Sequence, residues 1–324
     1  MKLLKKSKAY FGAVRRTANK SGLTGFGKFR IMLDIVVCRI RFGCSCKDYE
    51  QYQFYKYKNR YRKNFIADHH KKLVRKWISR FGTQHNKWED YLRLKELLSR
   101  QVIQLPECGE AAFAAFLKQH RKVVIKPCNS RAGFGLHVME YTTDADAAEY
   151  FSSLKGNAMC EEYVYQHPVI GALNPSSLNT IRIVTLMDGD RFTILSAALK
   201  MGGSADSVAD NLHQNGLAAA VHLESGIIYT PGRDYAGNTY LHHPATGTQI
   251  IGVQIPHWEL VKETLHKAHV IMQPKPYIGW DVAITHTGVE IIEANTMPGH
   301  VTMQYFDQIP KGKQVLALAR QRRK

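Results

Sequence analysis

The sequence lacks several features that would place it in common protein classes. No apolar run approaches the roughly 18 residues that a membrane-spanning helix needs. The basic N-terminus also has no continuous apolar segment of the kind that a secretory signal carries. The six cysteines form no CxxC pair and have no histidine at metal-ligand spacing, which argues against structural zinc. We therefore expect reduced thiols and a cytoplasmic protein, either free or peripheral at the inner membrane face.

Acidic residues are scarce at one end of the chain only. The formal charge of the 324 residues is +18, and residues 1–80 hold 22 Lys and Arg against 4 Asp and Glu. The remaining residues hold 23 of each sign and are neutral. An excess this localised predicts that residues 1–80 meet an anionic partner, such as a membrane surface, a polyanionic glycan or a nucleic acid. The neutral part is where we look for chemistry.

Residues 1–80 are predicted to form basic helices, with their most apolar stretch at residues 31–42. We favour a buried helix there, packed onto the rest of the protein. The alternative is an amphipathic element on anionic lipid, anchored by Arg39, Arg41 and the lysines near the N-terminus. Aromatic and basic residues also interleave between positions 52 and 65, which would suit single-stranded nucleic acid. Their spacing suits inward packing equally well, so we do not expect nucleic acid as a partner.

The remainder shows helical and strand periodicities in alternation. A helix with one buried face is predicted over residues 88–100. Strands are predicted at residues 123–126, 136–141 and 159–164, with helices at 144–154 and 258–271. Two hairpins follow, one of residues 179–187 and 191–201, the other of residues 278–285 and 289–295. Mixed, largely antiparallel β structure with covering helices is an α+β fold. We expect three parts, namely residues 1–80, 81–165 and 166–324.

The first group of candidate binding residues is a lysine followed by a glycine-containing loop. An apolar strand delivers Lys126, and the loop of residues 129–135 has glycines that let backbone N–H groups approach an anion. Lysine and loop together would grip a phosphate. The pattern is neither a Walker A sequence nor a Rossmann fingerprint, because no GKS or GKT follows and the loop leads into a strand. Most glycine loops are simple turns, so the loop alone favours a turn.

The second group is acidic and lies in the C-terminal hairpin. Asp281 belongs to one strand, and Glu293 and Asn295 belong to the next. Residues two apart on a strand share a face, and carboxylate and amide oxygens are the ligands that Mg²⁺ prefers. Alternatively, Asp281 caps a turn and the other two are solvated. We disfavour that alternative because all three lie within apolar strands, where an unpaired charge is costly.

Two further candidates have open interpretations. Arg182 lies on the polar face of a predicted strand, where it is either a salt-bridge partner or a guanidinium that binds a transferring phosphoryl group. Asp210, Asn211 and His213 either orient a substrate or cap the loop before the strand at Leu217. The residues alone do not choose between these roles.

In their order along the chain, these motifs resemble the ATP-grasp superfamily. The resemblance is to its sugar-transfer-associated branch, which is similar to glutamate ligase-like enzymes, and it spans about residues 88–300. It is carried by IKPCNSRAGFG, CEEYV, NPSSLNTIRIVT, ADNLHQNG, GWDVAIT and VEIIEANTMPG. The resemblance implies an ATP-grasp fold with a lid subdomain at residues 81–165 and a core with the Mg²⁺ and ATP site at residues 166–324.

The resemblance also implies roles for individual residues. Phosphates would be held by Lys126 and by the loop that contains Ser130, Arg131, Gly133 and Gly135. Adenine and ribose would be read by Glu161, Glu162 and Val164, and Asn211 joins the nucleotide-binding candidates. Arg182 would stabilise the transferring phosphoryl group, and Mg²⁺ would be ligated by Asp281, Glu293 and Asn295.

One position departs from the family pattern. Glutamate ligase-like relatives carry a second phosphate-binding lysine before the lid, and the matching residue here is Tyr91. Lys87 and Lys95 lie one turn away on the same helix face and could substitute. We expect a ligase that uses ATP to phosphorylate a carboxylate of a polysaccharide-related sugar or amino acid, for attack by an amine or related nucleophile. The alternatives are a small-molecule kinase and a non-catalytic nucleotide-binding protein that docks on a membrane or on glycan-synthesis machinery.

Overall fold

The computed structural model describes residues 2–56, 59–82, 86–129, 135–207 and 210–321, and it divides into two compact units. The first unit is Met1–Gly82 with Gly299–Lys324, and the second is Thr83–Pro298. The C-terminal residues therefore group with the N-terminal ones, whereas the sequence pattern placed them with the core. This division sharpens the charge asymmetry. The first unit has 28 Lys and Arg against five Asp and Glu, and the second has 17 against 22.

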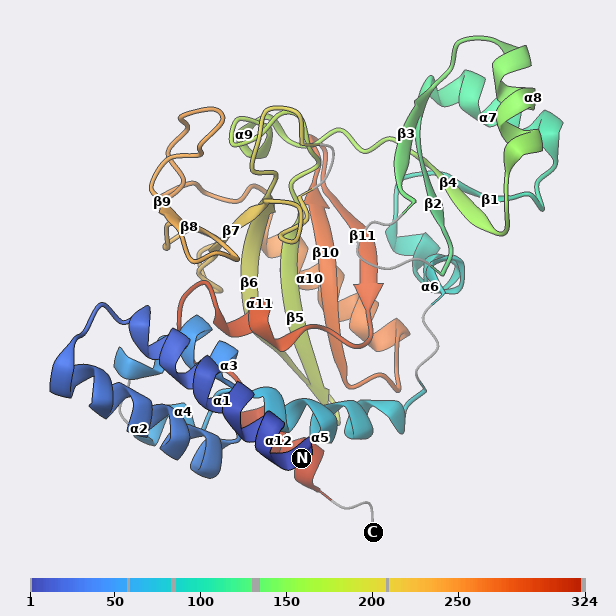
Figure 1. The fold of residues 1–324 in the computed structure, drawn as a ribbon. Coiled ribbons are helices and arrows are strands. Elements are labelled where there is room, and N and C mark those ends of the chain that lie inside the picture. Colours follow the sequence, from blue (N-terminus) through green and yellow to red (C-terminus); the bar gives the residue numbers. More distant parts are fainter. Residues whose placement is uncertain (1, 57–58, 83–85, 130–134, 208–209, 322–324) are drawn as a thin grey trace. The chain divides into compact units, whose positions relative to one another are not determined.

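The first unit is helical where the structure describes it, as predicted for residues 1–80 (Figure 1). Its N-terminal elements are α1 (Lys2–Asn19), α2 (Gly25–Phe42), α3 (Cys46–Gln51), η1 (Phe54–Lys56), α4 (Asn59–Arg62) and α5 (Asp68–Ser79). Its C-terminal elements are α11 (His300–Gln304) and α12 (Lys313–Arg320). A capping box starts α3, where Ser45 and Asp48 exchange side-chain and backbone hydrogen bonds. The rings of Tyr52, Phe54 and Phe65 are buried in the core of this unit.

The second unit begins with a helix and a small antiparallel sheet. The helix α6 (Lys87–Leu94) continues into the 3₁₀ turn η2 (Lys95–Leu97). The small sheet has the order β1-β4-β2-β3 and consists of β1 (Val102–Leu105), β2 (Lys122–Pro127), β3 (His137–Glu140) and β4 (Ala158–Glu162). The helices α7 (Glu110–His120) and α8 (Asp144–Ser153) pack on it through Phe113, Leu117 and Ala147.

A larger antiparallel sheet completes the second unit, in the order β11-β10-β5-β6-β7-β8-β9. Its strands are β5 (Ile181–Asp188), β6 (Arg191–Met201), β7 (Leu217–Ala220), β8 (Gly232–Asp234), β9 (Thr239–Tyr240), β10 (Tyr277–Ile284) and β11 (Val289–Asn295). The short helix α9 (Pro168–Gly171) precedes β5. Figure 1 shows α10 (Trp258–Ile271) behind this sheet, and its residues Val261 and Leu265 share a buried core with the strands.

Both predicted hairpins and the helix of residues 258–271 are confirmed. Gly189 has a φ of 59°, a value that glycine adopts without strain, in the turn between β5 and β6. The helix predicted over residues 88–100 is shorter, because the chain leaves helical geometry at Leu98 and carries Arg100 toward β11. In the described ranges, each helix is too short or too polar to cross a membrane.

Candidate nucleotide and metal site

Three charged side chains stand in one row across neighbouring strands of the larger sheet. Asp281 of β10 lies opposite Glu293 of β11 and opposite Arg182 of β5. Directly paired residues on antiparallel strands present their side chains on the same face of a sheet. The register therefore brings Asp281 together with Glu293 and with Arg182, whose role the sequence left open.

A lysine that the sequence did not reveal lies beside this row, two residues along β6 from the partner of Arg182. Lys200 of β6 places its Nζ 3.1 Å from Asp281 Oδ1 and 3.2 Å from Asp210 Oδ1. Arg182 Nη2 lies 2.9 Å from the other oxygen of Asp281. Burial alone would lower the pKa of Lys200, but Asp210 and Asp281 outweigh it and raise that pKa. Lys200 therefore stays protonated, and its place in the apolar strand SAALKM was the signal that could have identified it.

The side-chain oxygens of Asp281, Glu293 and Asn295 are candidate ligands for Mg²⁺. Asp281 Oδ1 is buried and, within the described residues, accepts no hydrogen bond of good geometry despite its ion pair with Lys200. Asn295 Oδ1 accepts the backbone N–H of Met297 at 3.0 Å. Among described residues, no three His, Cys, Asp or Glu side chains gather as a metal cluster. Two carboxylates and an amide fit a magnesium ion that takes its other ligands from phosphates and water.

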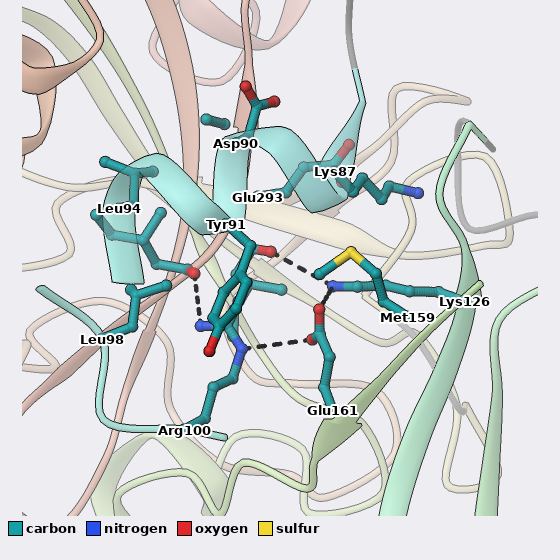
Figure 2. A pocket seen from close by; sticks show the side chains of 13 residues that line it. Lys87, Asp90, Tyr91, Leu94, Leu98, Arg100, Lys126, Met159, Glu161 and Glu293 are labelled. Atoms are coloured by element: carbon teal, nitrogen blue, oxygen red, sulfur yellow. Dashed lines mark hydrogen bonds and ion pairs between the residues drawn. The ribbon is translucent and has the colours of Figure 1, made fainter. Parts of the chain in front are cut away.

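The small sheet contributes a second cationic group. Lys126 of β2 is buried, and its Nζ lies 2.7 Å from Glu161 Oε1 on β4 and 3.5 Å from the backbone oxygen of Ile292 on β11 (Figure 2). Burial would raise the pKa of Glu161, but Lys126 and Arg100 lower it below its usual value. The ionised Glu161 thus fixes the lysine ammonium next to β11, which carries Glu293.

Arg100 links this lysine pair to the larger sheet, a role that the sequence did not reveal. Its guanidinium lies 3.4 Å from Glu161 Oε2 and 2.8 Å from Glu290 Oε2. It also donates a hydrogen bond of 2.8 Å to the backbone oxygen of Ile291. Lys126, Glu161, Arg100 and Glu290 form a chain of alternating buried charges, which we call the buried charge chain. It joins the small sheet to β11 through charge-assisted contacts.

A recess that is open to solvent lies beside this chain and is lined from both sheets and from α6. Lys87, Lys126, Glu161 and Glu293 all contribute to its wall (Figure 2). Burial lowers the pKa of Lys87, with Glu293 opposing that shift and Lys126 adding to it. Lys87 therefore supplies the second lysine of the recess. Lys95, in contrast, has a side chain that is 55% exposed and lies near Glu96.

The remaining predicted residues are distributed less simply. Ser130, Arg131 and Gly133 lie outside the described residues. Gly135 is described, with a φ of 75°, and a Cβ there would come within 2.9 Å of Pro127 Cγ, so the end of this loop requires glycine.

The segment expected to read adenine and ribose is split across two faces. Glu161 points into the recess, but Glu162 lies on the opposite face of β4, where it accepts the N–H of Gln101 at 3.2 Å. Val164 follows β4 in the connection to the larger sheet. Asn211 accepts the backbone N–H of His213 at 2.9 Å, which is the loop-capping arrangement that the sequence left open.

The chain is similar in fold to solved ATP-grasp ligases, at low sequence identity. PsnB, an ATP-grasp ligase solved with Mg and ADP, is 11% identical, with a TM-score of 0.44 over 72% of this chain and 58% of that protein. D-alanyl-alanine synthetase A from Vibrio cholerae is 13% identical, with a TM-score of 0.45 over 72% and 63%. The VanG D-Ala:D-Ser ligase from Enterococcus faecalis is 14% identical, with a TM-score of 0.45 over 72% and 60%. The chain thus spans about three-fifths of each of these proteins.

No curated protein matches the sequence. The family model described as sugar-transfer associated ATP-grasp matches residues 83–321. This range contains the whole of the second unit, including the charged row, the buried charge chain and the recess. Because the match covers well over half of the sequence, the protein belongs to the sugar-transfer associated ATP-grasp family.

Proposed function

We propose that the protein is an ATP- and Mg²⁺-dependent ligase that activates a carboxylate as an acyl phosphate and joins it to an amine or a related nucleophile. One observation carries this proposal. Lys87, Lys126 and Glu293 line one recess, and Glu293 also belongs to the row that contains Asp281 and Arg182. The two lysines could bind a polyphosphate, and the two carboxylates beside them could bind a metal ion. Arg182 could stabilise the negative charge that develops during phosphoryl transfer.

The nucleotide phosphates would be held by Lys126 and Lys87, with the loop of residues 129–135 over them. Relatives have a second phosphate-binding lysine where this chain has Tyr91. Because Lys87 lines the recess and can take the place of that lysine, we favour a working enzyme over a non-catalytic nucleotide binder. Adenine and ribose would be read by Glu161, Val164 and the backbone of Glu162. Asn211 would act through the loop that it caps.

Asp281, Glu293 and Asn295 would hold Mg²⁺, which when bound neutralises phosphate charge and polarises the phosphoryl oxygens. The protein's own contribution is to fix these oxygens before substrate arrives. Arg182 and Lys200 hold the Asp281 carboxylate at 2.9 and 3.1 Å, so its orientation is set by two cations. Preorganised ligands of this kind reduce the reorganisation that the transition state would otherwise require.

The proposed reaction has two displacements. A carboxylate oxygen of the substrate attacks the γ-phosphorus of ATP, the bond to the β-phosphate oxygen breaks and ADP leaves. The amine nitrogen then attacks the acyl carbon and loses a proton, and inorganic phosphate departs as the amide forms. The guanidinium of Arg182 would stabilise the charge on the transferring phosphoryl group and on the acyl phosphate.

The substrate side of the site is cationic and aromatic. Tyr235 is close enough to Arg182 and Lys200 for both to oppose the rise in its pKa that burial causes. The centroid of its ring lies 4.8 Å from the centroid of the His213 ring. A carboxylate attached to a polysaccharide-related sugar or to an amino acid suits this surface, and the name of the family favours the sugar. We place the reaction in the cytoplasm, where ATP is supplied.

Trapping with hydroxylamine tests the proposal. The protein is incubated with ATP, Mg²⁺ and a panel of sugar and amino acid carboxylates, and an acyl phosphate is captured as a hydroxamate. We expect hydroxamate to form with release of ADP, and Arg182→Met to slow it by roughly 10² to 10³. The matched control is Arg191→Met, an exposed arginine on the same hairpin, which should leave the rate unchanged. A stable phosphoester without hydroxamate would instead identify the small-molecule kinase.

A further inference from the structure

Helix α2 of the first unit has apolar residues on two opposite faces. One face, which includes Ile35 and Cys38, is buried in the core of that unit. The other face is exposed and consists of Phe26, Phe29, Leu33, Val37 and Ile40. Steps of three and four residues along a helix bring these five side chains into one line. We call this line the apolar stripe.

The apolar stripe is unusually exposed for large hydrophobic side chains. Phe26 is 76% exposed, Ile40 is 78% exposed, and the least exposed member, Val37, is at 39%. Single exposed apolar side chains are normal on protein surfaces. A continuous line of five apolar side chains on one helix is different, because a contiguous exposed apolar surface marks a binding site for a protein, a membrane or a ligand.

The charge around the apolar stripe is positive. Arg30 and Arg41 are exposed, and each lies four residues after a stripe member, Phe26 and Val37 respectively. The unit as a whole has a net charge of +23. The acidic residues of residues 1–80 are already engaged inside the unit, in the contacts Asp34–Arg62, Glu50–Lys20, Asp68–Lys71 and Asp48–Ser45. A partner for this surface is therefore both apolar and anionic.

We propose that the apolar stripe, with Arg30 and Arg41, docks the first unit on the surface of an anionic lipid bilayer, with α2 lying in the interfacial plane. An interfacial helix buries its apolar face at the boundary of the acyl chains while basic residues contact anionic headgroups. Ile35 and Cys38 hold the opposite face of α2 in the protein core, so the stripe is presented in a fixed orientation.

Other occupants fit the surface less well. A nucleic acid would stack its bases on a series of exposed rings, but only Phe26 and Phe29 of the stripe are aromatic, and Leu33, Val37 and Ile40 are aliphatic. A second copy of this chain would bring together two units of net charge +23, and like charges oppose such contact. Anionic lipid supplies both an apolar layer and a negative surface.

Sedimentation of the full-length protein with lipid vesicles tests the proposal. Vesicles contain phosphatidylcholine either alone or with about 30% phosphatidylglycerol, a level that gives a negative surface potential. We expect binding only to the anionic vesicles. The double variant Leu33→Ser with Ile40→Ser should lose at least a factor of roughly ten in affinity for these vesicles, because it removes two apolar side chains from the stripe. The matched control is Ile309→Ser, which changes a 48% exposed isoleucine of the same unit and should bind as the wild type does.

A charge variant tests the electrostatic part separately. Arg30→Glu with Arg41→Glu should weaken binding at least about fivefold for each charge removed, and added salt should weaken the wild type in the same way. Because all four positions are exposed, thermal unfolding of both variants should match the wild type. Failure of the wild type to bind anionic vesicles would overturn the proposal. So would binding that the stripe variant leaves intact, or a dimer in solution that the stripe variant dissociates.

Discussion

Replacing Glu161 by Gln removes one negative charge from the middle of the buried charge chain. In the wild type, Lys126 and Arg100 both contact Glu161, and Arg100 also contacts Glu290. The four side chains are between 3% and 6% exposed, so water screens them little. After the change, Arg100 keeps its contact with Glu290, but Lys126 loses its 2.7 Å ion pair.

The expected cost follows from the burial of the pair. Removing one partner of a buried ion pair typically destabilises a protein by about 3–5 kcal/mol, because the other charge is left without compensation. The neighbouring Glu162→Gln is the matched control. Glu162 has a side chain that is 40% exposed and lies 3.8 Å from His120, and loss of such a surface pair costs about 0–1 kcal/mol. For a domain of this size, the first change corresponds to a fall in Tm of roughly 6–20 °C.

Urea unfolding followed by tryptophan fluorescence measures the difference. Trp88, Trp258 and Trp280 all lie in the second unit and report on it. Lys126 and Arg100 hold the pKa of Glu161 below its usual value in the folded protein. The ionised carboxylate therefore adds to the free energy of unfolding at any pH above its usual pKa, and this contribution is lost as the pH falls through the lowered pKa. The Glu161→Gln variant should lack this acid dependence. Equal destabilisation by the Glu161 and Glu162 variants would refute the reasoning.

Two further predictions concern the charged row and acid stability. A Cβ at position 279 would lie 3.1 Å from Arg182 Nη1 and 2.7 Å from Pro298 Cβ, so Gly279→Ala should displace Arg182. Hydroxamate formation should then slow while nucleotide affinity, measured by calorimetry, changes little. Burial holds the pKa of His269 and of His300 at about 4. The unfolded state binds more protons below about pH 6.5, so stability should fall as the pH falls, by about 2 kcal/mol per histidine at pH 5. Urea unfolding at pH 7 and pH 5 measures this, and a flat profile would contradict it.

Local signals in the sequence predicted much of the second unit. The Asp188-Gly189-Asp190 turn fixed one hairpin, and alternation within VEIIEAN placed Glu293 and Asn295 on a strand next to Asp281. The pairing of Asp281 with Glu293 also followed from the assigned hairpin, because paired strands keep opposite residues together. These features depend on residues that are close in sequence or on one hairpin register.

The residues that were missed depend on distant partners. Arg100 contacts Glu290, which is 190 positions later, and no local pattern encodes that pairing. Lys200 was passed over because its strand reads as apolar, although a lone lysine among buried residues needs carboxylates nearby. The sequence also could not show which face of α2 is buried, because apolar residues occupy both sides of that helix.

Calorimetric titration of a non-hydrolysable ATP analogue tests the central claim most directly. The wild type is compared with Lys87→Ala, Lys126→Ala and Glu293→Gln in the presence and absence of Mg²⁺, and Lys95→Ala is the matched lysine control. We predict Mg²⁺-dependent binding that the three recess variants weaken and that Lys95→Ala leaves unchanged, since Lys95 is exposed outside the recess. No binding by the folded wild type, or equal losses for Lys87→Ala and Lys95→Ala, would contradict the proposed nucleotide site.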